Sequence, residues 1–375
     1  MTKKKIILII AASLLFCLIV FFAVFAILKY RQVVVKVNQD NSSTVTPTAT
    51  PTLDPDRPFS ILLMGYGGGV HEGGTLTDSI IIAEFVPKEK KIKLISVPRD
   101  LWVPIPVAVG VTKMSKVNAA YSIGLDDKKY PNKETQFTGN AGGGQMSKYV
   151  LSQIMGFSID NFATINFDGF LKTINTLGGI DVNVQKTFDD YFYPIEEKTT
   201  DICGKSVEEI TAITATMSGD KLDQQFNCRY EHLHFEKGLQ TMDAATALKF
   251  VRSRHSQEDG GDFNRSARQK LVIEAVKKKI ISLNFISKLI PFVNSLAGNL
   301  TTDIDLNKMQ ELISRVDDFK TYQIESFPIT NDNLLMNATS SDRQAILIPK
   351  LGENSWADIQ KFIVQPTATS SAVLK

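Results

Sequence analysis

An uninterrupted apolar segment, Ile6–Leu28, is the feature that most restricts what this chain can fold into. As a helix it would be roughly 35 Å long at about 1.5 Å per residue, enough to cross a bilayer. A cleaved signal peptide is the alternative, but its apolar region is shorter and ends at an A-x-A-like site. No such site follows Leu28. The segment is therefore predicted to be a retained transmembrane helix, residues 6–28.

Basic residues flank this segment on both sides, so the count of positive charges hardly decides its orientation. The very short leading segment favours residues 1–5 as a cytoplasmic N-terminus, with the rest of the chain outside the cell. Residues 29–57 are rich in Thr and Pro, a composition that prevents regular helix or sheet and predicts an extended linker. Residues 365–375 have a similar composition and are predicted to be disordered.

Residues 58–364 are predicted to form one extracytoplasmic globular domain. The chain has 375 residues and a net charge of +2, which excludes a polycationic nucleic-acid arm. Its four histidines form no H-E-x-x-H pattern, which excludes a zincin-type metalloprotease. Cys203 and Cys228 flank a weakly patterned insertion at about 199–232. The sequence leaves open whether they form a disulfide, as an oxidising compartment would allow.

Apolar strand patterns alternate with helical patterns along this domain. The strand patterns, of which the second and third form a predicted hairpin, are residues 59–65, 80–86, 91–97, 162–167, 180–184 and 321–327. The helical patterns are residues 143–155, 169–177, 242–251, 265–281 and 306–316. Apolar strands with helices before and after them predict an α/β fold with a mixed central sheet covered on both faces.

A glycine-rich run, Gly65–Gly69, follows the first predicted strand. It lacks the Gly-Lys-Ser/Thr of a P-loop and the last glycine of a dinucleotide loop. Its glycines still allow the backbone to approach a ligand closely. Asp78 begins the next strand and is a candidate ligand for a divalent cation. Arg99, at the end of the strand after that, is a candidate phosphate contact.

A group of polar residues late in the chain is the strongest constellation. Its members are Arg252, Arg254, Asp262, Arg265, Arg268 and Gln269. Asp262 stands where the N-cap of a helix is expected, and Arg265 and Gln269 share one face of that helix. A solvated basic face is the plain alternative, but the cations here are arginines in a chain with many lysines elsewhere. Arginine favours bidentate phosphate contacts, which suit phosphoryl transfer together with a bound metal.

The order of these motifs resembles the LytR–CpsA–Psr family of bacterial cell-wall enzymes. The resemblance covers about residues 59–281 and is carried by Leu76–Ile80, Ser96–Asp100, Lys116–Ala120, Asn166–Phe170, Leu177–Val182, Phe250–Arg254 and Asp262–Gln269. It implies a three-layer α/β/α fold with an apolar lipid pocket. It also implies Mg²⁺-dependent transfer of a glycopolymer from a polyprenyl-pyrophosphate carrier to peptidoglycan.

The resemblance assigns roles to the candidate residues. The residues that would bind the pyrophosphate are Arg99, Arg252, Arg254, Arg268 and Gln269. Asp262 and Arg265 would orient them, and Asp78 would bind Mg²⁺. The chain departs from the family at Tyr66, where an Asp is usual, and at Leu76, where an Arg is frequent. Glu72, in the same loop as Tyr66, is a hypothetical replacement metal ligand.

The function implied is that of a membrane-anchored phosphotransferase at the outer face of the membrane. The lipid tail is expected in an apolar pocket between the sheet and the helices at 143–155 and 169–177. A sugar hydroxyl of peptidoglycan would attack the phosphorus that carries the glycan, with Asp78, Asp100 or the pyrophosphate itself as the base. Two alternatives remain: a pyrophosphate hydrolase, and a non-catalytic lipid-binding or regulatory protein. No nucleic-acid partner is predicted, because no helix-turn-helix is evident and the charge is near neutral.

Overall fold

A computed structural model describes residues 56–69, 74–218, 220–282, 292–293, 295–315 and 319–364. The predicted transmembrane helix, most of the predicted linker, Glu72 and the predicted tail lie outside the described residues. Within the described ranges, no helix combines the length and the apolar character needed to cross a membrane. The chain divides into two compact units, the first from Met1–Phe170 and Asn284–Lys375, the second from Leu171–Leu283.

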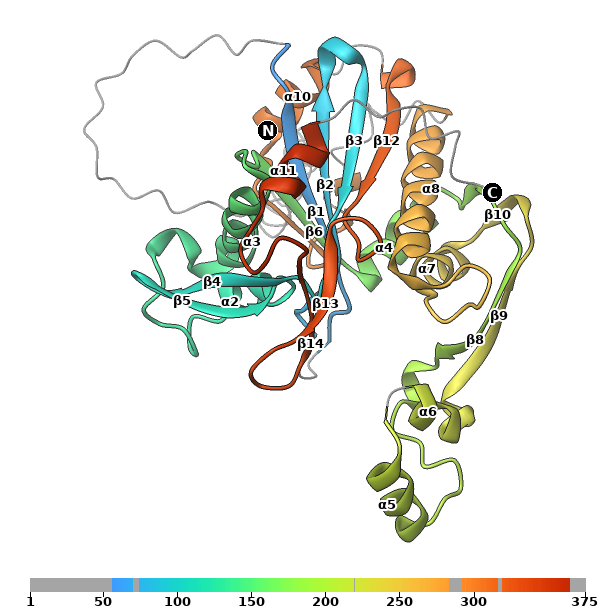
Figure 1. The fold of residues 1–375 in the computed structure, drawn as a ribbon. Coiled ribbons are helices and arrows are strands. Elements are labelled where there is room, and N and C mark those ends of the chain that lie inside the picture. The colour runs from blue at the N-terminus through green and yellow to red at the C-terminus, as the bar shows by residue number, and fades with distance from the viewer. Residues whose placement is uncertain are drawn as a thin grey trace, which may run out of the picture. The chain divides into compact units, whose positions relative to one another are not determined.

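A six-stranded sheet forms the centre of the first unit (Figure 1). Its strands are β1 (Phe59–Tyr66), β2 (Thr77–Val86), β3 (Lys91–Ser96), β6 (Asn161–Asn166), β11 (Leu300–Thr302) and β12 (Gln323–Pro328), in the order β11-β6-β1-β2-β3-β12. β1 runs antiparallel to β2 and parallel to β6, and β12 runs parallel to β3. The α/β fold with a mixed sheet is therefore confirmed. The predicted hairpin is also confirmed, because β2 and β3 pair antiparallel from Val86 and Lys91 onward.

One face of this sheet is buried under helices α2 (Ala119–Leu125), α3 (Gly139–Met155) and α11 (Ala357–Val364). Side chains on a strand alternate between its two faces. Leu62 and Met64 of β1 therefore point to the same side, together with Ile80 and Ile82 of β2, and all four belong to the main apolar core. The helices contribute to that core with Tyr121, Met146, Val150, Leu151, Ile154, Ile359 and Ile363. The predicted layer on the opposite face stays a prediction.

Glycines let α2 and α3 approach each other closely. A Cβ atom on Gly142 would lie 2.4 Å from the carbonyl oxygen of Gly124 and 2.5 Å from that of Phe137. A Cβ atom on Gly144 would lie 2.2 Å from the ring of Phe162 in β6. Helix α3 begins at Gly139, although the apolar pattern predicted a helix only from 143. Glycine is a poor helix former, but packing overrides that preference here.

Two hairpins of the first unit were not predicted from the sequence pattern. They are β4 (Trp102–Ala108) with β5 (Val111–Lys116), and β13 (Leu335–Thr339) with β14 (Ala345–Pro349). β4 contains Pro104 and Pro106, which cannot donate to a strand ladder and are tolerated only on strand edges. Helix α10 (Leu306–Arg315) lies where a helix was predicted.

The second unit contains the strand pair β7 (Ile180–Val184) with β10 (Gly238–Met242), the strand pair β8 (Phe188–Pro194) with β9 (Tyr230–Phe235), and the helices α7 (Ala244–Arg252) and α8 (Gly261–Ser282), beside the insertion described below (Figure 1). Both strand pairs are antiparallel. Helix α8 lies against β7. Helix α4 (Phe167–Thr176) links the two units in sequence. The rings of Phe188, Phe235 and Phe250 pack together in the core of this unit, with ring centroids 5.1 to 6.1 Å apart.

The insertion predicted at about 199–232 is helical. It contains the short helices α5 (Val207–Thr216) and α6 (Asp220–Asp223) and the 3₁₀ turn η4 (Gln224–Arg229), and the 3₁₀ turn η3 (Glu196–Lys198) directly precedes it. Ser206 caps α5 by accepting a hydrogen bond from the backbone N–H of Glu209, whose side chain bonds back to the Ser206 backbone. In Figure 1 these helices lie at the far end of the β8–β9 ribbon.

Replacing Gly142 by Ala is expected to destabilise the first unit. Alanine would favour the helix by about 1 kcal/mol, but overpacking against two backbone carbonyls costs about 1–3 kcal/mol or more because the backbone must shift. Thermal unfolding of the Gly142→Ala variant should show a midpoint several degrees lower. Asn140→Ala, at an exposed position of the same helix, is the matched control and should not lower it. An unchanged midpoint for Gly142→Ala would contradict the close approach of α2 and α3.

Candidate functional site

Asp78 and Arg99, the two predicted site residues of the first unit that the structure describes, form an ion pair. Asp78 is the second residue of β2, and Arg99 follows the end of β3. Because these strands are antiparallel, the start of β2 lies beside the end of β3. Nη1 of Arg99 donates to Oδ1 of Asp78 at 2.5 Å. The two side chains are 34% and 47% exposed, so both reach solvent.

Arg99 lies in an alternating series of charges. Its Nε is 3.6 Å from Oδ2 of Asp100, and Nζ of Lys116 donates to Oδ1 of Asp100 at 2.7 Å. The loop is also held by its backbone, because Asn118 N–H donates to the carbonyl of Arg99 at 3.3 Å. Partly exposed ion pairs contribute only about 0–1 kcal/mol. An anionic ligand can therefore replace Asp78 as the partner of Arg99 with little loss of free energy.

Tyr66 stands at the end of β1, where the family resemblance leads one to expect an Asp. Its ring lies 5.6 Å from that of Tyr121 in α2, and burial raises the pKa of the Tyr66 hydroxyl. Tyr66 is therefore neutral at pH 7 and offers a metal no negative charge. Gly68, at φ +83°, donates its N–H to the carbonyl of Gly74 at 3.0 Å, which closes the glycine loop. Glu72 belongs to the part of this loop that is not described.

The donor set of the first unit fits a Mg²⁺ ion shared with a substrate. Mg²⁺ in phosphate-transfer sites is bound through one or two carboxylates together with substrate phosphates and water. Asp78 supplies one carboxylate, whose Oδ1 accepts the hydrogen bond from Arg99. With Tyr66 in place of a second acid, such a site would need an oxygen ligand from a bound phosphate. The assignment of Asp78 as metal ligand stays a prediction.

Arg252 and Arg254 belong to the second unit, at and after the end of α7. Nη1 of Arg252 donates to Oε1 of Glu196 at 2.8 Å, and its guanidinium lies 5.5 Å from the centre of the Tyr193 ring. Arg254 is half-buried in the loop between α7 and α8. Its backbone N–H donates to Oδ2 of Asp190 at 3.1 Å, so the main chain of this residue is fixed.

Arg268, a predicted substrate contact, is buried in the second unit. The residue is 2% exposed, and its guanidinium donates to groups of the protein itself. Nε donates to the carbonyl of Phe250 at 3.0 Å, and Nη1 donates to the carbonyl and the carboxylate of Asp259 at 2.6 and 2.5 Å. Nη2 donates to the carbonyl of Ser253. These bonds use the guanidinium to hold the α7–α8 loop. The role of Arg268 as a substrate contact stays a prediction.

The start of α8 also differs from the prediction. The helix begins at Gly261, not near Arg265, so Asp262 lies in its first turn and is not the N-cap. Gly261 adopts φ +82°, a conformation that favours glycine and that marks the beginning of the helix. Nothing is described of the Asp262 side chain. Arg265 is buried at 8% exposure, and Gln269 is partly buried one turn later, as the i, i+4 spacing predicted.

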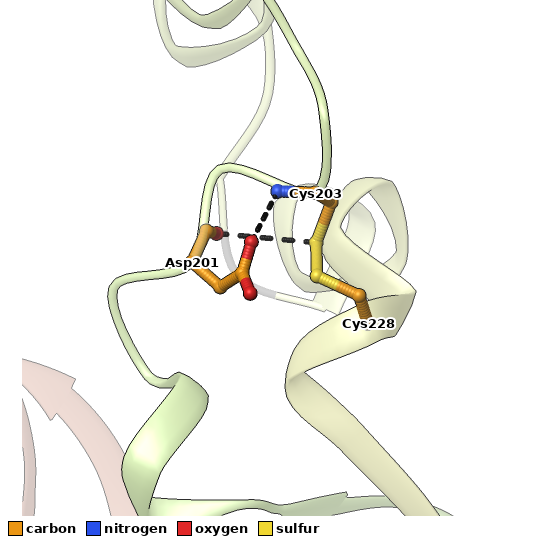
Figure 2. Close-up of side chains that lie close together, drawn as sticks. All are labelled: Asp201, Cys203 and Cys228. Carbon is orange, nitrogen blue, oxygen red and sulfur yellow. Dashed lines mark hydrogen bonds between the residues drawn. A yellow bond between two sulfur atoms is a disulfide. The ribbon is translucent and has the colours of Figure 1, made fainter.

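Cys203 and Cys228 form a disulfide with their Cα atoms 5.6 Å apart, which answers the question left open above (Figure 2). Oδ1 of Asp201 accepts a hydrogen bond from the backbone N–H of Cys203 at 2.8 Å. The sulfur and carboxylate atoms of these residues lie close enough together to suggest a metal centre. Thiolates are the sulfur ligands of metals, however, and both sulfurs here are in a covalent pair. The group is therefore a cross-link of the insertion.

The LytR_cpsA_psr family model matches residues 24–351. TagV of Bacillus subtilis, named a polyisoprenyl-teichoic acid–peptidoglycan teichoic acid transferase, is 27% identical over 286 residues, which cover 76% of this chain and 60% of TagV. TagU of Enterococcus faecalis, which has the same type of name, is 26% identical over 264 residues, or 69% of this chain and 66% of TagU. The match thus spans less than two thirds of the length of these relatives.

Solved structures share the fold. The crystal structure of B. subtilis TagV superimposes with a TM-score of 0.53 at 24% identity, covering 82% of this chain and 95% of TagV as crystallised. The structure of TagT bound to LI-WTA superimposes with a TM-score of 0.52 at 20% identity, covering 87% and 96% of the two chains. At these identities the likeness establishes the fold of the chain.

Replacing Arg268 by Met is expected to destabilise the second unit strongly. The change leaves the Asp259 carboxylate and three backbone carbonyls without their donor, and removing one partner of a buried pair costs about 3–5 kcal/mol. Thermal or urea unfolding measures the loss. Lys270→Met, which removes only an i, i+4 pair with Glu274, should cost less than about 0.5 kcal/mol. Normal stability with weakened ligand binding in Arg268→Met would instead support the predicted substrate contact.

Proposed function

Because the chain belongs to the LytR–CpsA–Psr family, we propose that it is a phosphotransferase that moves a glycopolymer from a polyprenyl-pyrophosphate carrier to peptidoglycan. The family match over residues 24–351 carries this proposal. The names of TagV and TagU support it, since both are described as transferring teichoic acid from a polyisoprenyl carrier to peptidoglycan. For this chain we propose the class of the donor, a glycan linked to a polyprenyl pyrophosphate, and no particular polymer.

The residue types support this chemistry. Arg99, Arg252, Arg254 and Gln269 are proposed to bind the pyrophosphate, and Arg265 and Asp262 to orient them. Guanidinium groups bind phosphate oxygens with two parallel hydrogen bonds and stay charged at any physiological pH. Fixed cations of this kind stabilise the charge that accumulates on a phosphoryl group during transfer.

In the proposed reaction an acceptor hydroxyl forms a new bond to the phosphorus that carries the glycan. The bond from that phosphorus to the bridging oxygen breaks, and the lipid monophosphate leaves with the electron pair. The hydroxyl proton passes to a base, for which Asp78, Asp100 and the departing phosphate remain the candidates. Mg²⁺ bound at Asp78 would neutralise charge on the pyrophosphate.

The proposed location is the outer face of the cell membrane. Residues 6–28 are proposed as a single transmembrane helix with the N-terminus inside, and residues 29–57 as the linker to the extracytoplasmic domain. The apolar character of residues 6–28 supports the anchor. The disulfide between Cys203 and Cys228 supports an oxidising compartment for the domain. We further propose that the domain has a three-layer α/β/α arrangement with an apolar pocket that binds the lipid tail.

One observation favours an alternative. Tyr66 is a neutral residue where the family resemblance leads one to expect a metal-binding acid. A protein that keeps the lipid site but has weak metal binding would act as a lipid-binding or regulatory protein without turnover. Turnover that depends on a divalent cation excludes this alternative, and dependence on a glycan acceptor excludes the hydrolase.

Arg254→Ala is expected to abolish most of the transfer while leaving the fold intact. Loss of one charge-stabilising donor typically costs about 2–4 kcal/mol of transition-state stabilisation, or a factor of about 10²–10³ in rate. The full chain in detergent would be incubated with a polyprenyl-pyrophosphate glycan, a peptidoglycan oligosaccharide and Mg²⁺, and the joined product measured by mass spectrometry.

Lys278→Ala is the matched control, because it removes an exposed cation from α8. It should transfer like the wild type, and EDTA should stop the reaction of both proteins. Wild-type transfer by Arg254→Ala would refute the site assignment. Lipid monophosphate without joined product would point to the hydrolase.

A further inference from the structure

The loop between α7 and α8 contains Arg254, and its backbone lies outside both helices. It starts after Arg252, the last residue of α7, and ends at Gly261, the first of α8. Ser253 is fully buried at its beginning, and the Arg254 carbonyl accepts from Gly261 N–H at 3.2 Å at its end. A loop of this kind samples many conformations unless side chains fix it.

Asp190 of β8 fixes the first half of this loop, and no sequence pattern pointed to it. Its side chain is fully buried. Oδ2 accepts three hydrogen bonds, from Oγ of Ser253 at 2.6 Å and from the backbone N–H groups of Arg254 and His255 at 3.1 and 3.2 Å. Oδ1 accepts from the backbone N–H of Phe192 at 2.9 Å, which orients the carboxylate within its own strand.

Arg268 binds both ends of the loop, through the carbonyl of Ser253 at its start and the carbonyl and carboxylate of Asp259 near its end. Its guanidinium also lies 4.9 Å from the centre of the Phe188 ring. Phe188 and Asp190 come from the same strand, so β8 supports both ends of the arrangement. Asp190 and Arg268 carry opposite charges that stabilise each other electrostatically.

We propose that Asp190 is a positioning residue for the transfer reaction: it holds the Arg254 backbone in place so that the guanidinium is presented to the pyrophosphate in a fixed orientation. This proposal rests on the function proposed above, in which Arg254 contacts the substrate. Asp190 itself touches no substrate. Ser253 strengthens the arrangement by adding a side-chain donor to the same carboxylate oxygen.

The physical basis is the difference between a fixed and a mobile cation. A guanidinium whose main chain is already ordered loses less entropy on binding, and it acts without reorganisation when charge develops. Small misplacements are costly, since an error of about 1 Å can reduce a rate about 100-fold. Two backbone N–H groups that converge on one carboxylate oxygen define the position of the chain more narrowly than a single contact.

The carboxylate stays ionised over a wide pH range. Burial by itself raises the pKa of Asp190. The hydrogen bonds that the carboxylate accepts from Ser253 and from three backbone N–H groups lower the pKa by more than burial raises it, so the pKa lies below its usual range. The resulting stabilisation is fully present above the ordinary carboxyl pKa and is lost only as the pH falls through the lowered value. The loop is thus held at neutral and at mildly acidic pH.

The test uses Asp190→Asn in the full chain. The amide keeps the size of the carboxylate, but its NH₂ group must face either the Phe192 N–H or the three donors of the loop. Hydrogen–deuterium exchange at residues 253–260 should become about tenfold faster or more, while the rest of the second unit keeps its protection. Binding of inorganic pyrophosphate with Mg²⁺, measured by calorimetry, should weaken, and kcat for glycan transfer should fall about 10- to 100-fold.

Two further variants separate positioning from general destabilisation. Ser253→Ala removes one of the three donors to Oδ2, so it should produce smaller changes in the same direction. Phe226→Leu loosens a buried contact of η4 in the insertion, which has no bond to the loop among the described contacts. It should lower the unfolding midpoint without changing exchange at 253–260, pyrophosphate binding or kcat.

The outcomes are distinguishable from a failure of the proposed function. If the wild type binds pyrophosphate but transfers no glycan, the proposed reaction is wrong, while the exchange and binding data still decide the role of Asp190. Unchanged exchange at 253–260 in Asp190→Asn overturns the positioning role. The positioning role is also overturned if Phe226→Leu and Asp190→Asn have the same unfolding midpoint and show the same loss of kcat.

Discussion

A buried charge must find a partner for each of its hydrogen-bonding positions, and in the second unit this requirement decides where the arginines go. Arg268 and Asp190 are both almost completely buried, and most of the groups that satisfy them are backbone and side-chain atoms of the α7–α8 loop. The loop therefore cannot move without leaving a charge unpaired. These hydrogen bonds fix the main chain of Arg254, whose side chain is half-buried.

The arginines of this chain thus fall into two physical classes. Arg268, and by its burial Arg265, are enclosed in the second unit. Arg99 and Arg252 are partly exposed and form ion pairs with Asp78 and with Glu196. Such exposed pairs are weak and can be exchanged for a ligand. Sequence alone does not separate the classes, because a guanidinium that binds phosphate and one that binds carbonyl groups occupy similar positions in an arginine-rich motif.

The first unit contributes a different kind of constraint. Its mixed sheet brings the start of β2 beside the end of β3, and this antiparallel neighbourhood is what joins Asp78 to Arg99. Tyr66, at the end of β1, contributes a neutral phenol to the same unit, and burial raises the pKa of its hydroxyl. The metal chemistry proposed for this protein therefore depends on one described carboxylate and on the phosphates of the substrate. The glycine contacts between α2 and α3 serve the packing of the core.

The sequence by itself determined the elements whose periodicity is strong. The hairpin of β2 and β3, the strand β7 and the helices α7 and α10 were predicted within a few residues, because alternation and helical spacing report directly on local structure. It also determined the family, from motifs whose residue types suit phosphate chemistry. Weak or misleading local signals hid the proline-containing hairpin β4–β5 and the early start of α8 at Gly261.

Only the tertiary structure decided what each charged residue does. The pairing of Cys203 with Cys228, the enclosure of Arg268 and the role of Asp190 all depend on which segments meet after folding. Asp190 and its neighbour Asp189 look alike in the sequence, yet successive residues of a strand face opposite sides. One carboxylate is therefore buried against the loop, and the other faces solvent beside His232 and His234. The folded environment, and not the residue type, sets the function of an ionisable group.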